Sequence, residues 1–126
     1  MPAFVILEHE LPTDNPRGTH WDLMLEQEGM DSLLTWALTE IPRLGATIEA
    51  TQLPNHRPLY LHYEGPVSGN RGEVHRWDAG EYQTIHGSAQ SPNEVLMLEL
   101  KGEKLRSTVT ARQVSAVDQR WMFKFA

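Results

Sequence analysis

The sequence predicts an all-β protein, a small closed or nearly closed β-barrel of about eight strands with one or two short flanking helices. Short apolar or alternating segments recur roughly every 8–12 residues, with turn-forming residues between them. No long segment has the period of an amphipathic helix. The chain has 126 residues, 40% of them hydrophobic, which is enough to build the core of one domain spanning residues 1–126.

The first three strands are expected at residues 4–9, 20–26 and 32–38. The first is apolar enough to be largely buried, and it ends in a histidine. Residues 11–19 contain two prolines and a glycine, which favours a loop. A Glu-Gly pair at residues 28–29 favours a turn between the second and third strands.

The middle of the chain is less regular. Residues 47–53 fit either a strand or a short helix. Residues 54–58 contain two prolines, so we expect a loop there, leading into a strand at residues 59–64. Glycine and proline are frequent in residues 65–72, which predicts a segment rich in turns.

The C-terminal half is expected to form two hairpins and a final strand. Residues 72–77 and 81–85 would pair across an Asp-Ala-Gly turn, and residues 95–101 and 104–113 across a Gly-Glu turn. Residues 121–125 would form the last strand, with three aromatic side chains on one face because alternate residues of a strand point the same way.

Composition narrows the classes of site and partner. The chain has no cysteine, so any metal must bind to histidine, carboxylate or carbonyl groups. Its net charge of −6 argues against a protein that wraps nucleic acid through bulk electrostatics. The N-terminus lacks a basic segment, and the apolar run at residues 4–7 is too short for a signal peptide or a membrane span. We expect a cytoplasmic monomer that does not associate with membranes.

The segment His-Trp-Asp-Leu-Met-Leu-Glu at residues 20–26 alternates polar and apolar side chains. In a strand, His20 and Asp22 therefore project from the same face, roughly 7 Å apart at the backbone. An imidazole and a carboxylate together suit borderline divalent ions such as Mn²⁺ or Zn²⁺. The plainer interpretation, two polar residues on a solvated strand face, remains open on this motif alone.

The other histidines each have a structural explanation. His9 ends a strand, where it is either a third metal ligand or a solvated cap. His56 stands beside a proline in a turn, and His62 alternates with apolar residues as an ordinary strand-face residue. His75 and His86 are expected on the surface.

Seven short blocks together carry a more specific signal. They occupy residues 4–9, 20–26, 29–38, 56–65, 77–80, 102–105 and 121–124. In composition and in order they resemble the 3′-phosphoesterase domain found at the N-terminus of bacterial DNA ligase D. The blocks run nearly from end to end of the chain, although each is short.

The resemblance implies a small β-barrel that processes DNA or RNA 3′ ends in strand-break repair. Members remove a 3′-terminal ribonucleoside and then hydrolyse the remaining 3′-phosphate in a Mn²⁺-dependent reaction. For this chain we expect a divalent metal, Mn²⁺ first, with Zn²⁺ or Co²⁺ as alternatives. The metal ligands of the family fall on His9, His20 and Asp22. The active-site histidine and tyrosine fall on His56 and Tyr60. The implied partners are primer-templates with a 3′-phosphate or 3′-ribonucleotide, and a separate ligase or polymerase.

Two family features are missing, and both are arginines suited to clamping phosphate. Met24 replaces one, and residues 46–49 contain no counterpart of the other. Four arginines near the predicted site in the sequence are candidates to replace them: Arg17, Arg57, Arg71 and Arg76. We expect Arg57 or Arg71 to enter the active-site groove and bind substrate phosphate.

The sequence is therefore compatible with three functions. The first is a metal-dependent 3′-phosphoesterase, favoured by the retention of both imidazole ligands, the carboxylate, His56 and Tyr60. The second is a divergent, weakly active or inactive relative that binds a metal and a phosphorylated nucleic-acid end, favoured by Met24 and the acidic charge. The third is a protein-interaction barrel with a vestigial site. In the first case, Glu26 or Glu64 is a candidate to orient a ligand histidine.

Overall fold

The computed structural model describes residues 2–15, 18–89 and 94–126. Within these ranges the chain forms nine β-strands and one short 3₁₀ helix. They are β1 (Ala3–Glu10), β2 (His20–Glu26), β3 (Leu33–Leu38), β4 (Thr47–His56), η1 (Pro58–Leu61), β5 (Gly65–Pro66), β6 (Glu73–His86), β7 (Leu96–Gly102), β8 (Arg106–Ser115) and β9 (Arg120–Phe125). No helix in the described part of the chain has the length and apolar character needed to cross a membrane.

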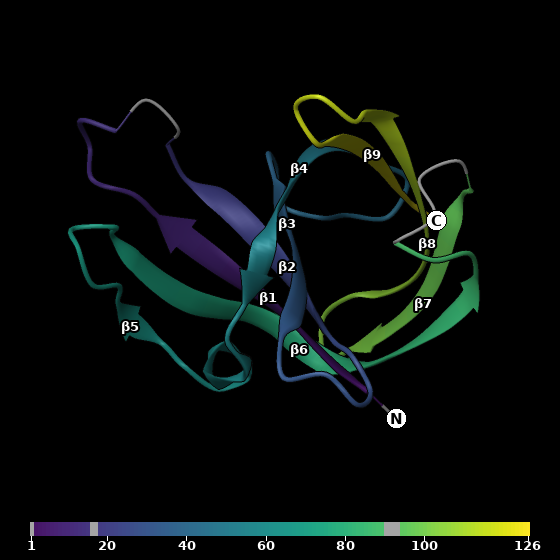
Figure 1. Ribbon diagram of the computed structural model, residues 1–126, viewed down its shortest axis with the longest axis horizontal. Coiled ribbons are helices and arrows are strands. Elements are labelled where there is room, and N and C mark those ends of the chain that lie inside the picture. The colour runs from purple at the N-terminus through teal and green to yellow at the C-terminus, as the bar shows by residue number, and fades with distance from the viewer. Residues whose placement is uncertain (1, 16–17, 90–93) are drawn as a thin grey trace.

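Eight of the strands close into an antiparallel barrel (Figure 1). Neighbours follow the order β1-β2-β3-β4-β9-β8-β7-β6, and β6 returns to pair with β1. The two-residue strand β5 lies outside the barrel, along the edge of β6. Full closure leaves the barrel strands without an unpaired edge. The prediction of an all-β, closed barrel of about eight strands is confirmed.

The barrel interior is filled by the inward half of each alternating strand. In β9, Trp121, Phe123 and Phe125 are all fully buried, as their period of two predicts. Trp36 of β3 meets Trp121 and Phe123 edge to face, at ring-centroid distances of 5.6 and 5.5 Å. Each side chain of this size stabilises the fold by roughly 1.5–3 kcal/mol through burial, so this cluster dominates the main core.

A second, smaller core lies on the outer face of β1 and β2. In β1, Phe4 and Ile6 join the interior, whereas Val5 and Leu7 join the outer cluster. Met24 of β2 is also part of this outer cluster. The segment between β4 and β6 covers it, with the following side chains packed against it: Tyr60, Leu61, Tyr63 and Val67. The outer face of β2 is therefore covered rather than solvated.

The predicted hairpin across residues 78–80 is wrong, because β6 runs without interruption from Glu73 to His86. Its first part pairs with β1 and its last part with β7, so tertiary pairing overrides the local turn preference of Asp-Ala-Gly. A register shift between Ile6 and Leu7 marks a bulge in β6 at Trp77, within its pairing with β1. Gly80 permits the close approach of β7 to β6, since a Cβ at this position would lie 2.1 Å from the carbonyl oxygen of Lys101.

The expected pattern over residues 54–64 is also wrong. Strand β4 resolves the open choice at residues 47–53 in favour of a strand and continues through His56. The predicted strand at residues 59–64 is replaced by η1, with Arg57 extended before it and Pro58 in its first turn. Proline favours this position because its fixed φ suits a helix start and its missing N–H would be unpaired there anyway. His62 caps the end of this helix and is not a strand-face residue.

Asp78 lies in β6 and not in the predicted turn, and it has a structural role there. Its buried carboxylate accepts hydrogen bonds from the backbone amides of Ala79, Glu103 and Lys104 through Oδ1, and from Leu105 through Oδ2. It thereby fixes the β7–β8 turn against β6.

We predict that Asp78→Ala lowers the free energy of unfolding by about 3 kcal/mol, because the buried Leu105 amide and the partly buried Lys104 amide lose their acceptor. Urea unfolding followed by tryptophan fluorescence measures this. Glu81→Ala removes an exposed carboxylate from the same strand and should change stability by less than about 0.5 kcal/mol. Equal effects of the two substitutions would contradict the role of Asp78.

Candidate metal and phosphate site

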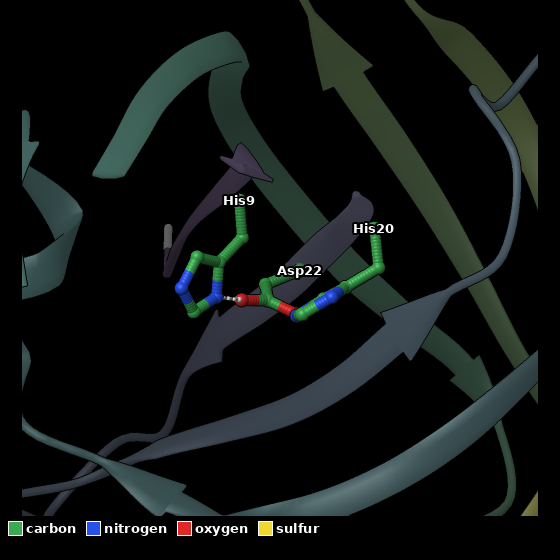
Figure 2. Close-up of side chains that lie close together, drawn as sticks. All are labelled: His9, His20 and Asp22. Atoms are coloured by element: carbon green, nitrogen blue, oxygen red, sulfur yellow. Dashed lines mark hydrogen bonds and ion pairs between the residues drawn. The ribbon is translucent and has the colours of Figure 1, made fainter. Parts of the chain in front are cut away.

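The β1–β2 register assembles the three predicted metal ligands. His9 lies directly opposite His20, and Asp22 lies opposite Leu7. Residues opposite each other in an antiparallel pair share a face, and so do residues two apart in one strand. His9, His20 and Asp22 therefore project together from the outer wall of the barrel (Figure 2).

Figure 2 shows the Asp22 carboxylate between the two imidazoles. Its Oδ2 lies 3.2 Å from His9 Nδ1, and its Oδ1 lies 3.1 Å from His20 Nε2. The two imidazole rings are 4.7 Å apart between centroids. One ligand atom from each residue falls within 4.8 Å of the other two. The three side chains thus converge on one small volume.

Asp22 is 1% exposed and His20 is 6% exposed, so the solvated-face interpretation does not describe this wall. Burial raises the pKa of the Asp22 carboxyl, but polar contact with His20 and His9, and attraction to them, outweigh that effect. The net result is a pKa below the usual range for aspartate. Asp22 is therefore held as a carboxylate, the form that binds a cation.

The residues present fit a divalent metal. Asp22 Oδ1 is buried and forms no hydrogen bond, although His20 Nε2 lies 3.1 Å from it. Two ligands bound to one ion at about 2.1 Å and at right angles lie about 3 Å apart, close to the separations seen here. Two imidazoles and one carboxylate suit borderline divalent ions. This donor set would hold such an ion with coordination positions left open.

A cavity of about 480 Å³ opens beside this cluster. Its polar lining includes His9, Asp22, Asn55, His56, Arg57, Tyr60 and Arg71. Apolar lining comes from Met24, Val67 and Val74, of which Met24 is 1% exposed. The cavity therefore combines cationic groups, titratable groups and an apolar patch next to the metal ligands.

The two residues that the resemblance singled out as catalytic stand on one wall of the cavity. His56 ends β4 and Tyr60 lies in η1, with their rings meeting edge to face at 5.7 Å. His56 Nδ1 is 2.9 Å from the carbonyl oxygen of Pro54, which favours a proton on Nδ1. This contact leaves Nε2 as the nitrogen available to a ligand.

The four arginine candidates are placed differently. Arg57 and Arg71 both line the cavity. Arg76 is exposed and is not among the lining residues, and Arg17 lies outside the described residues. Cationic groups therefore reach the cavity from the start of η1 and from the β5–β6 turn.

The two acidic residues considered as orienting groups bind backbone amides. Glu26 accepts from the amide of Ala3 at 3.0 Å, and Glu64 accepts from that of Arg76 at 2.6 Å. His9 Nε2 is instead 2.7 Å from the carbonyl oxygen of Arg71. Sequence reasoning missed this contact, because a backbone carbonyl carries no residue-type signal.

Residues 8–112 match the model of a known family, described as the DNA ligase D 3′-phosphoesterase domain. The match covers most of the chain. This chain belongs to that family. No curated protein matches it. As a member of the 3′-phosphoesterase domain family, it has the fold and the histidine–aspartate cluster that the sequence blocks indicated, and the cavity lies beside that cluster.

We predict that Mn²⁺ stabilises the protein through this cluster. At an ion concentration of about 100 times Kd, the free energy of unfolding should rise by about 2.7 kcal/mol. Thermal unfolding with and without Mn²⁺ measures the shift in Tm. His20→Ala should abolish the shift, whereas His86→Ala, which removes an exposed histidine of β6 outside the cluster, should retain it. A full shift in His20→Ala protein would place the ion elsewhere.

Proposed function

We propose that this chain is a metal-dependent phosphoesterase that hydrolyses 3′-terminal phosphoesters of DNA or RNA. The observation that supports it best is the buried Asp22 carboxylate, set between two imidazoles at a cavity that also holds two arginines. Family membership supports the phosphoesterase class. Mn²⁺ is the metal we propose, with Zn²⁺ and Co²⁺ as alternatives, held by His9, His20 and Asp22. Such an ion supplies Lewis-acid neutralisation of charge on the phosphoryl group.

Arg57 and Arg71 would bind the phosphate. Each guanidinium can donate parallel hydrogen bonds to phosphate oxygens, and both line the cavity. Met24 offers no such donor, so these two side chains would provide the cationic contacts that β2 does not. Their cationic charge also gives the cavity a local attraction for phosphate in a chain with a net charge of −6.

His56 would act as the proton donor or acceptor at the reacting phosphoester. Its Nδ1 contact with Pro54 fixes the ring and leaves Nε2 free to exchange a proton with a ligand. Tyr60 packs edge to face on His56 and lines the same cavity, so it would orient either that ring or the phosphate. In this proposal His56 and Tyr60 are the catalytic residues.

In the cell we propose a cytoplasmic role in repair of strand breaks. The substrate would be a primer-template ending in a 3′-phosphate or a 3′-ribonucleotide, and the product a 3′-OH that a separate polymerase or ligase can extend or seal. The second candidate function is a weakly active relative that binds a metal and a phosphorylated end. The apolar Met24 at the cavity favours it, because each missing charge-assisted contact can cost about 10²–10³ in rate.

The first test is hydrolysis of a primer-template bearing a 3′-phosphate or a 3′-terminal ribonucleotide. We predict release of phosphate or ribonucleoside that requires Mn²⁺ and falls by about 10²-fold or more in His20→Ala protein. His86→Ala is the control and should keep full activity. Mn²⁺-dependent stabilisation without release from either substrate would favour the binding protein over the enzyme.

The second test asks whether Arg57 binds substrate. Arg57→Ala should raise KM about tenfold, the expected effect of losing a charge-assisted hydrogen bond to phosphate. Arg76→Ala removes an exposed arginine that does not line the cavity and should leave KM unchanged. Steady-state kinetics on the 3′-phosphate substrate distinguishes the two. An unchanged KM in Arg57→Ala protein would remove Arg57 from the proposed phosphate site.

A further inference from the structure

The turn that joins β5 to β6 lies directly against the end of β1. It is closed by a hydrogen bond of 2.8 Å from the amide of Val67 to the carbonyl of Gly72. Gly72 has φ +81°, and a Cβ there would lie 1.8 Å from the carbonyl oxygen of Glu10. Only glycine allows the turn to approach β1 this closely. The position of residues 68–72 is therefore set by contact with the strand that carries His9.

This close approach brings the backbone of Arg71 into contact with His9. The Arg71 carbonyl oxygen is 2.7 Å from His9 Nε2, and a carbonyl can only accept, so Nε2 is the donor in this contact. Nδ1 is then the nitrogen that faces Asp22 Oδ2, at 3.2 Å. A hydrogen bond of this kind selects which ring nitrogen binds a metal and fixes the orientation of the ring.

The side chain of Arg71 is held by Ser68, at the other end of the turn. Arg71 Nε donates to the carbonyl oxygen of Ser68 at 2.6 Å, and Nη2 donates to Ser68 Oγ at 3.1 Å. A guanidinium has five N–H groups, so three are not used by these two bonds. Because the arginine lines the cavity, fixing it in advance lowers the conformational entropy lost when it binds an anion.

We propose that residues 68–72 form one positioning unit, in which Arg71 orients a metal ligand through its backbone and a phosphate-binding group through its side chain. Ser68 and Gly72 are its positioning residues. This inference rests on the proposed function, since it concerns the metal and phosphate of the same site. It has a specific consequence: removing the side chain of Arg71 weakens phosphate binding alone, whereas displacing the backbone weakens metal binding as well.

The test compares four variants of the full chain. Mn²⁺ affinity is measured from the electron paramagnetic resonance signal of the free ion, and the affinity for inorganic phosphate is measured in the presence of saturating Mn²⁺. Arg71→Ala keeps the carbonyl, so the Kd for Mn²⁺ should change less than threefold while phosphate affinity falls about tenfold or more. Ser68→Ala should lower phosphate affinity about fivefold and leave Mn²⁺ affinity unchanged.

Gly72→Ala should raise the Kd for Mn²⁺ about 10–100-fold, the usual effect of losing a partner of a ligand histidine. Gly69→Ala is the matched control. Gly69 lies in the same turn at φ +74°, but a Cβ there meets only Arg71 Nε, at an ordinary 3.7 Å. The two substitutions share the backbone strain and differ in the clash with β1. Gly69→Ala should therefore change the Kd for Mn²⁺ less than threefold.

A measurement on the unaltered protein covers the case in which Gly72→Ala does not fold. The ¹⁵N shifts of His9 in metal-free protein should show a protonated, hydrogen-bonded Nε2. Two results would overturn this inference: an unprotonated Nε2, or equal Mn²⁺ affinities in Gly72→Ala and Gly69→Ala proteins. If the wild type still binds Mn²⁺ in either case, the proposed metal site is upheld. Wild-type protein that binds no Mn²⁺ would overturn the proposed function and this inference together.

Discussion

The site depends on the antiparallel register between β1 and β2. Pairing His9 with His20 and Leu7 with Asp22 brings two imidazoles and a carboxylate from separate strands onto one patch of the outer wall. Because side chains alternate with a period of two, a shift of the pairing register by one residue would point the site side chains of one strand into the barrel interior. The inward side chains, such as Leu23, resist that slip because they belong to the main core. Packing inside the barrel therefore fixes the geometry outside it.

The same two strands carry buried apolar side chains on both faces. Inside is the aromatic core, and outside is the smaller cluster that includes Met24 and Leu61. The second cluster removes water from one end of the outer wall, and the cavity begins where it ends. Asp22 lies at this boundary, so it is shielded from solvent yet still reaches the cavity. Charged interactions are stronger there than on an open surface, because less water screens them.

The cationic groups of the cavity come from segments that lie outside the barrel. Arg57 precedes η1, and Arg71 belongs to the turn before β6, whereas the β2 position two residues after Asp22 holds an apolar methionine. Such connections accept changes of sequence more readily than barrel strands, because they carry fewer packing constraints. The β5–β6 turn is nevertheless constrained by two local contacts. The guanidinium of Arg71 donates hydrogen bonds to Ser68, and Gly72 packs closely against β1.

The sequence by itself determined the features that depend on alternation along one strand. It indicated the all-β class, the aromatic face of β9 and the shared face of His20 and Asp22, because a period of two is a local property of the backbone. Only the tertiary structure decided the course of β6 and the helical turn at Tyr60, since pairing with distant strands and packing on the outer core outweigh local preference. It also decided the burial of Asp22 and its approach to the two imidazoles. The contact of the Arg71 carbonyl with His9 joins residues 62 positions apart, and backbone atoms leave no trace in residue type.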